Sequence, residues 1–444
     1  MLANRRTAHI YFYLFWIIVL IRIILFITQP APLDGVWQLS GHWSLTRGVF
    51  FFNEYTQHHF EHFHTINIVL WPLLKILGAE PVQWFYSLIF LINAFLLYRI
   101  FEKSSNPLHA ILSIIVVSSS LFFLGRLEDV FLLISLMVVY RSINFQLHNA
   151  YLVVVTAMSP LIHPVCAGGM LGVLIALRMA NRISFNQLML GCSVTLLVGL
   201  SLFLPNFHAY SHQISYRISG EHSGLISSPF TLSGILLLFA VWMLTKKKRT
   251  YWWLLGCFTL VLLALSKPFY LATLIPILLI IPLKDDLLAF QRALLVILAT
   301  IFIFVQTINP LFQRFENPSH ITDYFHLKKE LIDFVPTGAH TFVEPTFAQG
   351  LLESPDTRNV LIDHKRFIIY WSDTVKPGDQ IIVVGSGKVA TLVQKYQETA
   401  FSIDTLSANR IGILSLNSLY QRRANDLTLY CLTSRQRIEP IIKP

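Results

Sequence analysis

Long apolar stretches separated by short polar segments dominate the chain from Tyr11 to Val305. A bilayer core about 30 Å thick needs about 20 apolar residues in each spanning helix. The two stretches between residues 129 and 160 are short, so we expect them to be sheltered by neighbouring helices or paired as a hairpin. The pattern predicts about eleven membrane-spanning helices, near residues 10–28, 81–101, 108–124, 129–141, 148–160, 163–179, 187–204, 229–245, 251–266, 269–283 and 288–306.

The pattern changes after residue 309, where apolar runs become short and are separated by turn signals such as Pro377-Gly378-Asp379. This alternation predicts an α/β domain over residues 310–444, following a transmembrane helical domain over residues 1–309. The expected strands are 340–344, 358–362, 380–384, 400–404, 410–416 and 427–432, and the expected helices are 321–334 and 388–398.

Two longer polar stretches, residues 29–80 and 206–228, are expected as loops outside the cytoplasm. The first contains an apolar run from Ile66 to Leu77 that is too short to span, so we predict that it lies in the membrane interface. Pro30 and Pro32 disrupt a signal-peptide cleavage pattern, so the first apolar run is predicted to be an uncleaved anchor.

Charge sets the expected orientation, because Lys and Arg in short loops resist translocation. With the N-terminus in the cytoplasm, thirteen such residues lie on the cytoplasmic side and five on the other. An odd number of spans then places residues 310–444 outside the cytoplasm. The compact loops favour a bacterial inner membrane.

Composition agrees with a membrane protein, since 54% of residues are hydrophobic and 13% charged, against about 25% charged in soluble domains. The net charge of +10 would suit nucleic acid, but the cations lie mainly beside apolar runs. We therefore expect them to contact membrane lipids and exclude nucleic acid as a partner. The four cysteines have no disulfide or metal-site spacing.

Several ionisable residues are candidates for chemistry at the outer face. Asp34, directly after the first predicted span, could accept a hydroxyl proton or hold a divalent cation against phosphate. The alternative is a turn cap, a common position for Asp. The histidine-rich stretch from His58 to His64 could bind a metal or sense pH, although it has no recognised metal spacing and also suits a solvated interface.

The segment Gly125-Arg126-Leu127-Glu128-Asp129 interrupts two apolar runs on the expected outer side. Ionisable groups at membrane depth are costly and are usually paired or functional. The segment is therefore either a turn with a local pair of Arg and carboxylate or part of a site. Arg22, inside the first predicted span, either snorkels outward or contacts a lipid phosphate.

Four basic residues are expected at the outer face, where they could surround an anionic lipid headgroup or serve as ordinary interfacial anchors. They are Lys75, Arg126, Arg217 and Lys267.

Gly385-Ser386-Gly387-Lys388 follows a predicted strand and opens a predicted helix, and Asp404 lies beyond, in the manner of a dinucleotide fingerprint. It is not a P-loop, because Ile382 stands where the first glycine belongs and Val389 replaces Ser or Thr. A nucleotide-binding site in a domain outside the cytoplasm would also lack its ligand. We interpret the glycines as residues of a tight strand-to-helix turn.

The chain resembles the C-type glycosyltransferases (the GT-C fold), close to the protein O-mannosyltransferases and lipid A aminoarabinose transferases. Four features carry the resemblance: Asp34 with Trp37 after the first span, His64 before an interfacial stretch that ends at Gly78, Arg126-Leu127-Glu128 at an outer hairpin, and Lys267 to Tyr270 with Pro276 in a late span.

The resemblance implies transfer of a sugar from a polyprenyl-phosphate donor to a lipid, glycan or protein acceptor at the outer face. Asp34 would be the general base or a metal contact, and Glu128 or Asp129 a second acidic contact. The C-terminal domain would cap the site. The metal, if any, is undetermined, with a divalent cation as one option. The implied substrate-binding residues are His64, Lys75, Arg126, Arg217, Lys267 and Tyr270.

Two other functions stay open. A transporter or lipid flippase is favoured by the interruption of one apolar stretch at Pro160 and Pro164, around His163, although no internal repeat is evident. An inactive scaffold is favoured because Gly35 follows Asp34 where the family usually has a second acidic residue. A carrier would depend on polar residues at the bilayer midplane, a transferase on Asp34, and a scaffold on neither.

Overall fold

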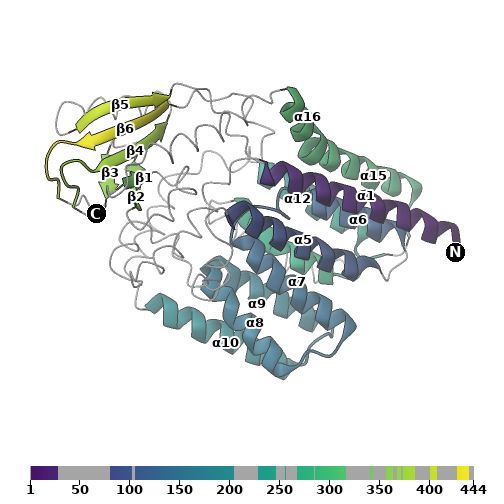
Figure 1. Cartoon of the computed structure of the whole chain (residues 1–444). Coiled ribbons are helices and arrows are strands. Elements are labelled where there is room, and N and C mark those ends of the chain that lie inside the picture. Colours follow the sequence, from purple (N-terminus) through teal and green to yellow (C-terminus); the bar gives the residue numbers. More distant parts are fainter. Residues whose placement is uncertain are drawn as a thin grey trace. The chain divides into compact units, whose positions relative to one another are not determined.

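The protein divides into two compact units, one of residues 1–26 and 85–313 with a short later segment, and one that includes residues 314–415 and 421–444. Figure 1 shows helices in the first and a sheet in the second. The computed structural model describes residues 2–28, 81–102, 106–204, 229–246, 256, 268–284, 286–316, 341–343, 357–363, 368–371, 374–385, 401–407 and 428–439.

Helices occupy ten of the eleven predicted spans, and of the remaining one, residues 251–266, only Gly256 is described. The described helices are α1 (Leu2–Ile27), α5 (Pro81–Phe101), α6 (Pro107–Ser118), α7 (Glu128–Asn144), α8 (Asn149–Ile162), α9 (Pro164–Met179), α10 (Phe185–Phe203), α12 (Pro229–Leu244), the 3-10 helix η4 (Pro268–Leu274), α14 (Ile275–Ile280), α15 (Ala289–Ile303), the π-helical η5 (Phe304–Ile308) and α16 (Asn309–Glu316).

The described part of the chain contains four helical stretches long and apolar enough to cross a bilayer. Five further apolar helices have 10 to 17 residues each and are shorter than a full span. The chain is therefore mostly helical and carries the apolar helices of a membrane protein. The four long stretches are His9–Ile27, Gln83–Phe101, Phe185–Leu202 and Ala289–Phe312.

The predicted helix 108–124 is too long, because α6 ends at Ser118 and the backbone is extended at Ser119. The Ser119 hydroxyl accepts a hydrogen bond from the Leu121 N–H at 3.2 Å. Serine side chains that bond nearby backbone in this way compete with the helix. The apolar pattern gives no sign of this hydrogen bond. It therefore predicted a helix over residues 119–124, which instead form a connection between α6 and α7.

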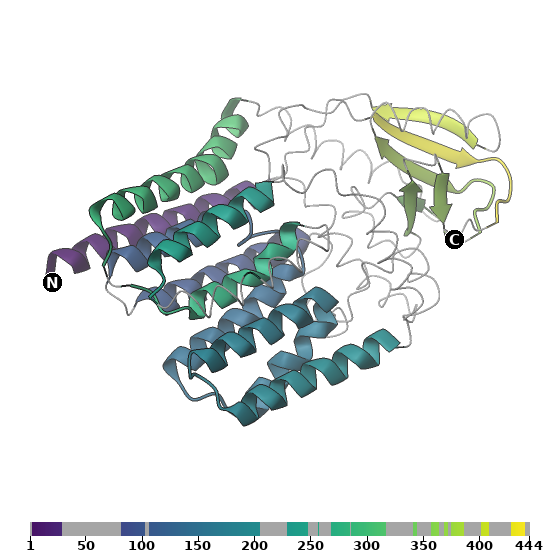
Figure 2. The same ribbon diagram turned by 180° about the vertical axis from the view of Figure 1, so that it is seen from behind.

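Prolines shape other helix ends. Pro160 has no N–H to donate to the Thr156 carbonyl, which instead accepts from the hydroxyls of Ser159 (3.0 Å) and Thr195 (3.3 Å). Thr195 lies on α10, so this bond ties α10 to α8, and Figure 2 shows these helices side by side. Likewise Pro310 has no N–H to donate to the helix. The Asn309 N–H before it donates to the Phe304 carbonyl, five residues earlier, which is the hydrogen bond of a π turn.

Gly169 allows a close approach of α9, α7 and η4. A Cβ atom at this position would lie 2.8 Å from Phe131 Cζ and 3.0 Å from Thr273 Cβ. A Cβ atom at the neighbouring Gly168 would have no atom of the described residues within 4 Å. Small residues let helix backbones approach closely in membrane proteins, and here the three elements meet at one glycine.

Gly169→Ala is expected to lower the free energy of unfolding by about 1–3 kcal/mol, because the added methyl overpacks a filled contact. Gly168→Ala is the matched control, and it should be neutral or stabilising by up to about 1 kcal/mol through helix propensity. Thermal unfolding of the purified variants in detergent measures both. Equal effects of the two substitutions would contradict the close contact.

The second unit contains a six-stranded sheet in the order β3-β2-β1-β4-β6-β5. β1 pairs in parallel with β2 and β4, and the other pairs are antiparallel. The strands are β1 (Thr341–Val343), β2 (Thr357–Asp363), β3 (Ile368–Trp371), β4 (Gln380–Gly385), β5 (Phe401–Ser407) and β6 (Thr428–Ser434).

Strands occupy five of the six predicted positions, and β3 is a strand that the pattern missed. The predicted strand 410–416 and the predicted helices 321–334 and 388–398 lie outside the described residues. The predicted turn at Pro377-Gly378-Asp379 is confirmed. Gly378 has φ +91°, and the Asp379 N–H donates to the Lys376 carbonyl at 3.0 Å, as in a turn with Pro and Gly at its centre.

Candidate functional site

The connection between α6 and α7 is the most unusual segment of the helical unit. Every residue from Ser118 to Val130 is buried, although residues 119–127 are not helical. Irregular backbone at membrane depth is tolerated only where protein shelters it and its polar groups find partners. The Ser120 hydroxyl donates to that of Ser233 on α12 at 2.8 Å, and two buried charged side chains supply further partners.

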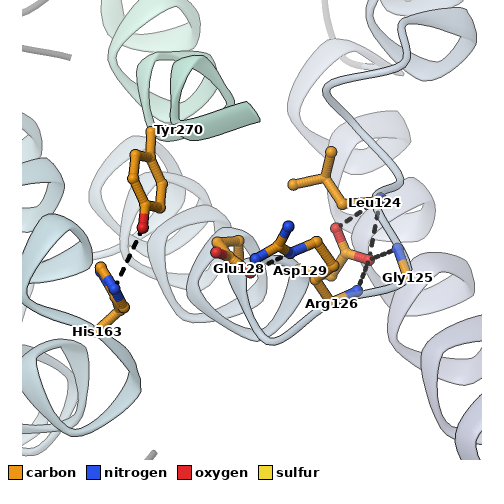
Figure 3. Close-up of polar contacts among 7 residues, drawn as sticks. All are labelled: Leu124, Gly125, Arg126, Glu128, Asp129, His163 and Tyr270. Carbon is orange, nitrogen blue, oxygen red and sulfur yellow. Dashed lines mark hydrogen bonds and ion pairs between the residues drawn. The ribbon is translucent and has the colours of Figure 1, made fainter. Parts of the chain in front are cut away.

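Asp129, in the first turn of α7, is one of these partners. Its carboxylate accepts the backbone N–H groups of Leu124 (3.0 Å), Gly125 (2.8 Å) and Arg126 (3.4 Å), as Figure 3 shows. Gly125 has φ +67°, a conformation that favours glycine and turns the N–H groups toward one carboxylate. An anion at a helix N-terminus is also stabilised by the helix dipole. Asp129 therefore holds the connection together.

Arg22, on α1, is the other partner and binds the opposite end of the connection. Its Nη1 donates to the carbonyl oxygens of Val117 and Ser119, the latter at 3.0 Å. The guanidinium carbon lies 5.5 Å and 5.7 Å from the ring centroids of Phe90 and Phe123. Only 1% of Arg22 is exposed, so it does not snorkel. It caps the C-terminal end of α6, where a cation suits the dipole.

Arg126 and Glu128 form an ion pair, with Arg126 Nε 3.3 Å from Glu128 Oε2. The two residues are 7% and 2% exposed. The local pair of Arg and carboxylate that the sequence suggested is therefore present. It differs from an ordinary surface pair because both groups are withdrawn from water. Charge interactions are stronger inside a protein than in water.

A second pair of polar side chains joins α9 to η4. His163 Nε2 lies 3.3 Å from the Tyr270 hydroxyl, and the rings are 5.2 Å apart. His163 Nδ1 accepts the Val165 N–H at 3.1 Å and caps α9. The sequence marked Tyr270 as a candidate but not His163, whose only signal was its place between Pro160 and Pro164.

These two pairs belong to elements that pack against one another. Phe131 of α7 and Thr273 of η4 both meet α9 at Gly169. Glu128 and Tyr270 each precede those contact residues by three positions, about one helical turn. In the view of Figure 3 the Arg126–Glu128 pair lies between Asp129 and the His163–Tyr270 pair. A cation, a carboxylate, an imidazole and a phenol thus gather in one part of the helical unit.

The other predicted site residues lie outside the described residues, namely Asp34, His64, Lys75, Arg217 and Lys267. Their roles stay predictions. Within the described ranges, no group of three or more His, Cys, Asp or Glu side chains is placed to hold a metal ion.

Comparisons with known proteins identify no relative: no protein-family model matches the chain, and neither a curated protein nor a solved structure is significantly similar to it. The fold and the site define an apolar, mostly helical chain with candidate membrane-spanning helices and a buried, charged connection.

Proposed function

We propose that the chain is an integral membrane glycosyltransferase that moves a sugar from a polyprenyl-phosphate donor to a lipid, glycan or protein acceptor at the outer face. The observation that carries the proposal is the buried Arg126–Glu128 pair, which lies on a connection whose backbone N–H groups are bound by Asp129. A carboxylate and a cation kept away from water suit a reaction that moves a proton and releases a phosphate.

In the proposed reaction an acceptor hydroxyl oxygen attacks the anomeric carbon of the donor sugar. The bond from that carbon to the phosphate oxygen breaks, and the phosphate leaves with the electron pair. The acceptor proton passes to a carboxylate, for which Asp34 and Glu128 are the candidates. Arg126 offsets negative charge on the departing phosphate, together with Lys75 and Lys267.

The proposed topology has about eleven spans, a cytoplasmic N-terminus and an extracytoplasmic α/β domain, in a bacterial inner membrane. Support comes from helices at ten of the predicted segments and strands at five of the predicted positions. Arg99 at the end of α5, Arg141 near the end of α7 and Arg178 near the end of α9 agree with positive charge on the cytoplasmic side.

The second candidate is a carrier or lipid flippase, favoured by the helix break at His163 between α8 and α9. The buried charges of Arg22 and Asp129 do not favour it. These two side chains bind the backbone of one connection, so they stabilise the fold of that connection rather than line a transport path. An inactive scaffold is the third candidate.

Donor turnover by the purified chain tests the proposal. Detergent-solubilised protein is mixed with several polyprenyl-phosphate sugars and a membrane lipid extract as acceptor source, and the lipids are followed by mass spectrometry. We expect one donor to lose its sugar and yield polyprenyl phosphate. Heat-denatured chain is the control. Binding of a donor without conversion would favour the carrier, and absence of any donor binding would contradict the transferase.

A further inference from the structure

We infer that Arg141, held between two aromatic rings at the end of α7, binds the phosphate of an anionic membrane lipid. The inference goes beyond the proposed function, because it involves neither the sugar donor nor the Arg126–Glu128 pair. Glu128 is the first residue of α7, whereas Arg141 lies in its last turn, about 20 Å further along the helix axis.

Two aromatic side chains restrain the guanidinium of Arg141. Its central carbon lies 5.3 Å from the ring centroid of Tyr151, on α8, and 5.7 Å from that of Phe145, the C-cap of α7. Such cation–π contacts hold the flat group in place. Arg141 is exposed, and no carboxylate pairs with it in the part of the chain that the structure describes. A restrained guanidinium of this kind suits a phosphate, which two of its N–H groups can bind together.

The surroundings of Arg141 favour a lipid over a soluble phosphate. Met137 lies about one turn before Arg141 on α7, and Val154 lies about one turn after Tyr151 on α8. These two apolar residues are 38% and 57% exposed, and Phe145 is 59% exposed. Acyl chains of a lipid bound at Arg141 therefore have apolar side chains to contact. Basic and aromatic residues are also common at the headgroup level of membrane proteins.

The charge around Arg141 favours an anionic headgroup over a zwitterionic one. The Gln187 amide, at the start of α10, donates to the Leu147 carbonyl at 2.6 Å, so the α9–α10 connection meets the α7–α8 connection. Arg178, in the last turn of α9, and Arg182, in the α9–α10 connection, are both exposed at this end of the helical unit. Positive charge there attracts an anionic headgroup and repels the ammonium of a zwitterionic one.

Four substitutions separate the restrained cation from general positive charge. Arg141→Gln removes the cation, and the matched control Arg182→Gln removes a cation from the same end of the helical unit. Arg141→Lys keeps the charge but loses the flat group with two parallel donors. Phe145→Leu keeps the charge and an apolar side chain but removes one ring. All three positions are exposed, so the variants should fold, which their melting temperatures check.

The readout is lipid binding by the full chain in detergent, measured by native mass spectrometry. The probes are phosphatidylglycerol, phosphatidylcholine with the same acyl chains, and glycerol phosphate, which lacks acyl chains. We expect the wild type to bind phosphatidylglycerol most tightly. Arg141→Gln should weaken this binding about tenfold, and Arg141→Lys and Phe145→Leu about threefold each. Arg182→Gln should change it less than about twofold.

Wild-type affinity for phosphatidylglycerol in Arg141→Gln would overturn the inference. An equal loss in Arg182→Gln would also overturn it, because general positive charge would then explain the binding. Phosphatidylcholine bound as tightly as phosphatidylglycerol would contradict the anionic preference, and glycerol phosphate bound as tightly would identify a soluble phosphate as the ligand. None of these results depends on sugar transfer, so failure of this inference and failure of the proposed function are distinguishable.

Discussion

Arg22→Met is expected to lower the free energy of unfolding of the helical unit by about 3–5 kcal/mol. Methionine fills most of the volume but cannot donate, so the Val117 and Ser119 carbonyls lose a charged donor inside the protein. Each buried hydrogen bond from a charged donor contributes about 1.5–3 kcal/mol, and two such bonds are lost, which explains the size of the effect.

Thermal and denaturant unfolding of the purified chain measures this loss. Arg99→Met is the matched control, because Arg99 lies in an exposed ion pair with Glu102 at 2.9 Å and such pairs contribute at most about 1 kcal/mol. Arg22→Lys should fall between the two, since an ammonium can reach the carbonyls but lacks the flat face over Phe90 and Phe123. Comparable losses for Arg22→Met and Arg99→Met would disprove the role.

The parts of the fold that the sequence predicted are those encoded locally. Apolar runs located the described helices as far as Ile303, and short apolar runs between turn signals located five strands. The polar helix α16 (Asn309–Glu316) has no such run and was not predicted. β3 (Ile368–Trp371) was missed although a short apolar run, Phe367 to Trp371, follows the polar residues Asp363 to Arg366, because the run is only five residues long and no turn signal with Gly or Pro precedes it. Its pairing with β2, with Tyr370 opposite Leu361, is a tertiary contact rather than a local pattern.

The site was predictable in residue type but not in arrangement. The five-residue segment at Gly125 to Asp129 was marked because ionisable groups interrupt an apolar run, and its local pair is present. The partners of Arg22 lie 95 and 97 positions along the chain. His163 and Tyr270, which contact each other, are 107 positions apart. No pattern of hydrophobic positions records which distant elements meet, so these contacts required the structure.

Glu128→Gln is expected to reduce donor turnover by about 100- to 10,000-fold, the usual contribution of a positioned acid or base. The amide keeps the shape of the side chain and its oxygen can still accept from Arg126, so the connection should fold. It cannot take up a proton from the acceptor hydroxyl. Turnover is measured by lipid mass spectrometry at saturating donor, so that a loss of the chemical step is separated from a loss of binding.

Glu102→Gln is the matched control for this prediction. Glu102 also pairs with an arginine, Arg99, at 2.9 Å, but it lies just after the C-terminal end of α5 and is about one third exposed. Its substitution should leave turnover within about twofold of wild type, because an exposed pair contributes little. Asp34→Asn adds the discriminating comparison. If Asp34→Asn abolishes turnover while Glu128→Gln retains it, Asp34 is the base and Glu128 only anchors Arg126. If Glu128→Gln alone abolishes turnover, the buried pair carries the proton transfer.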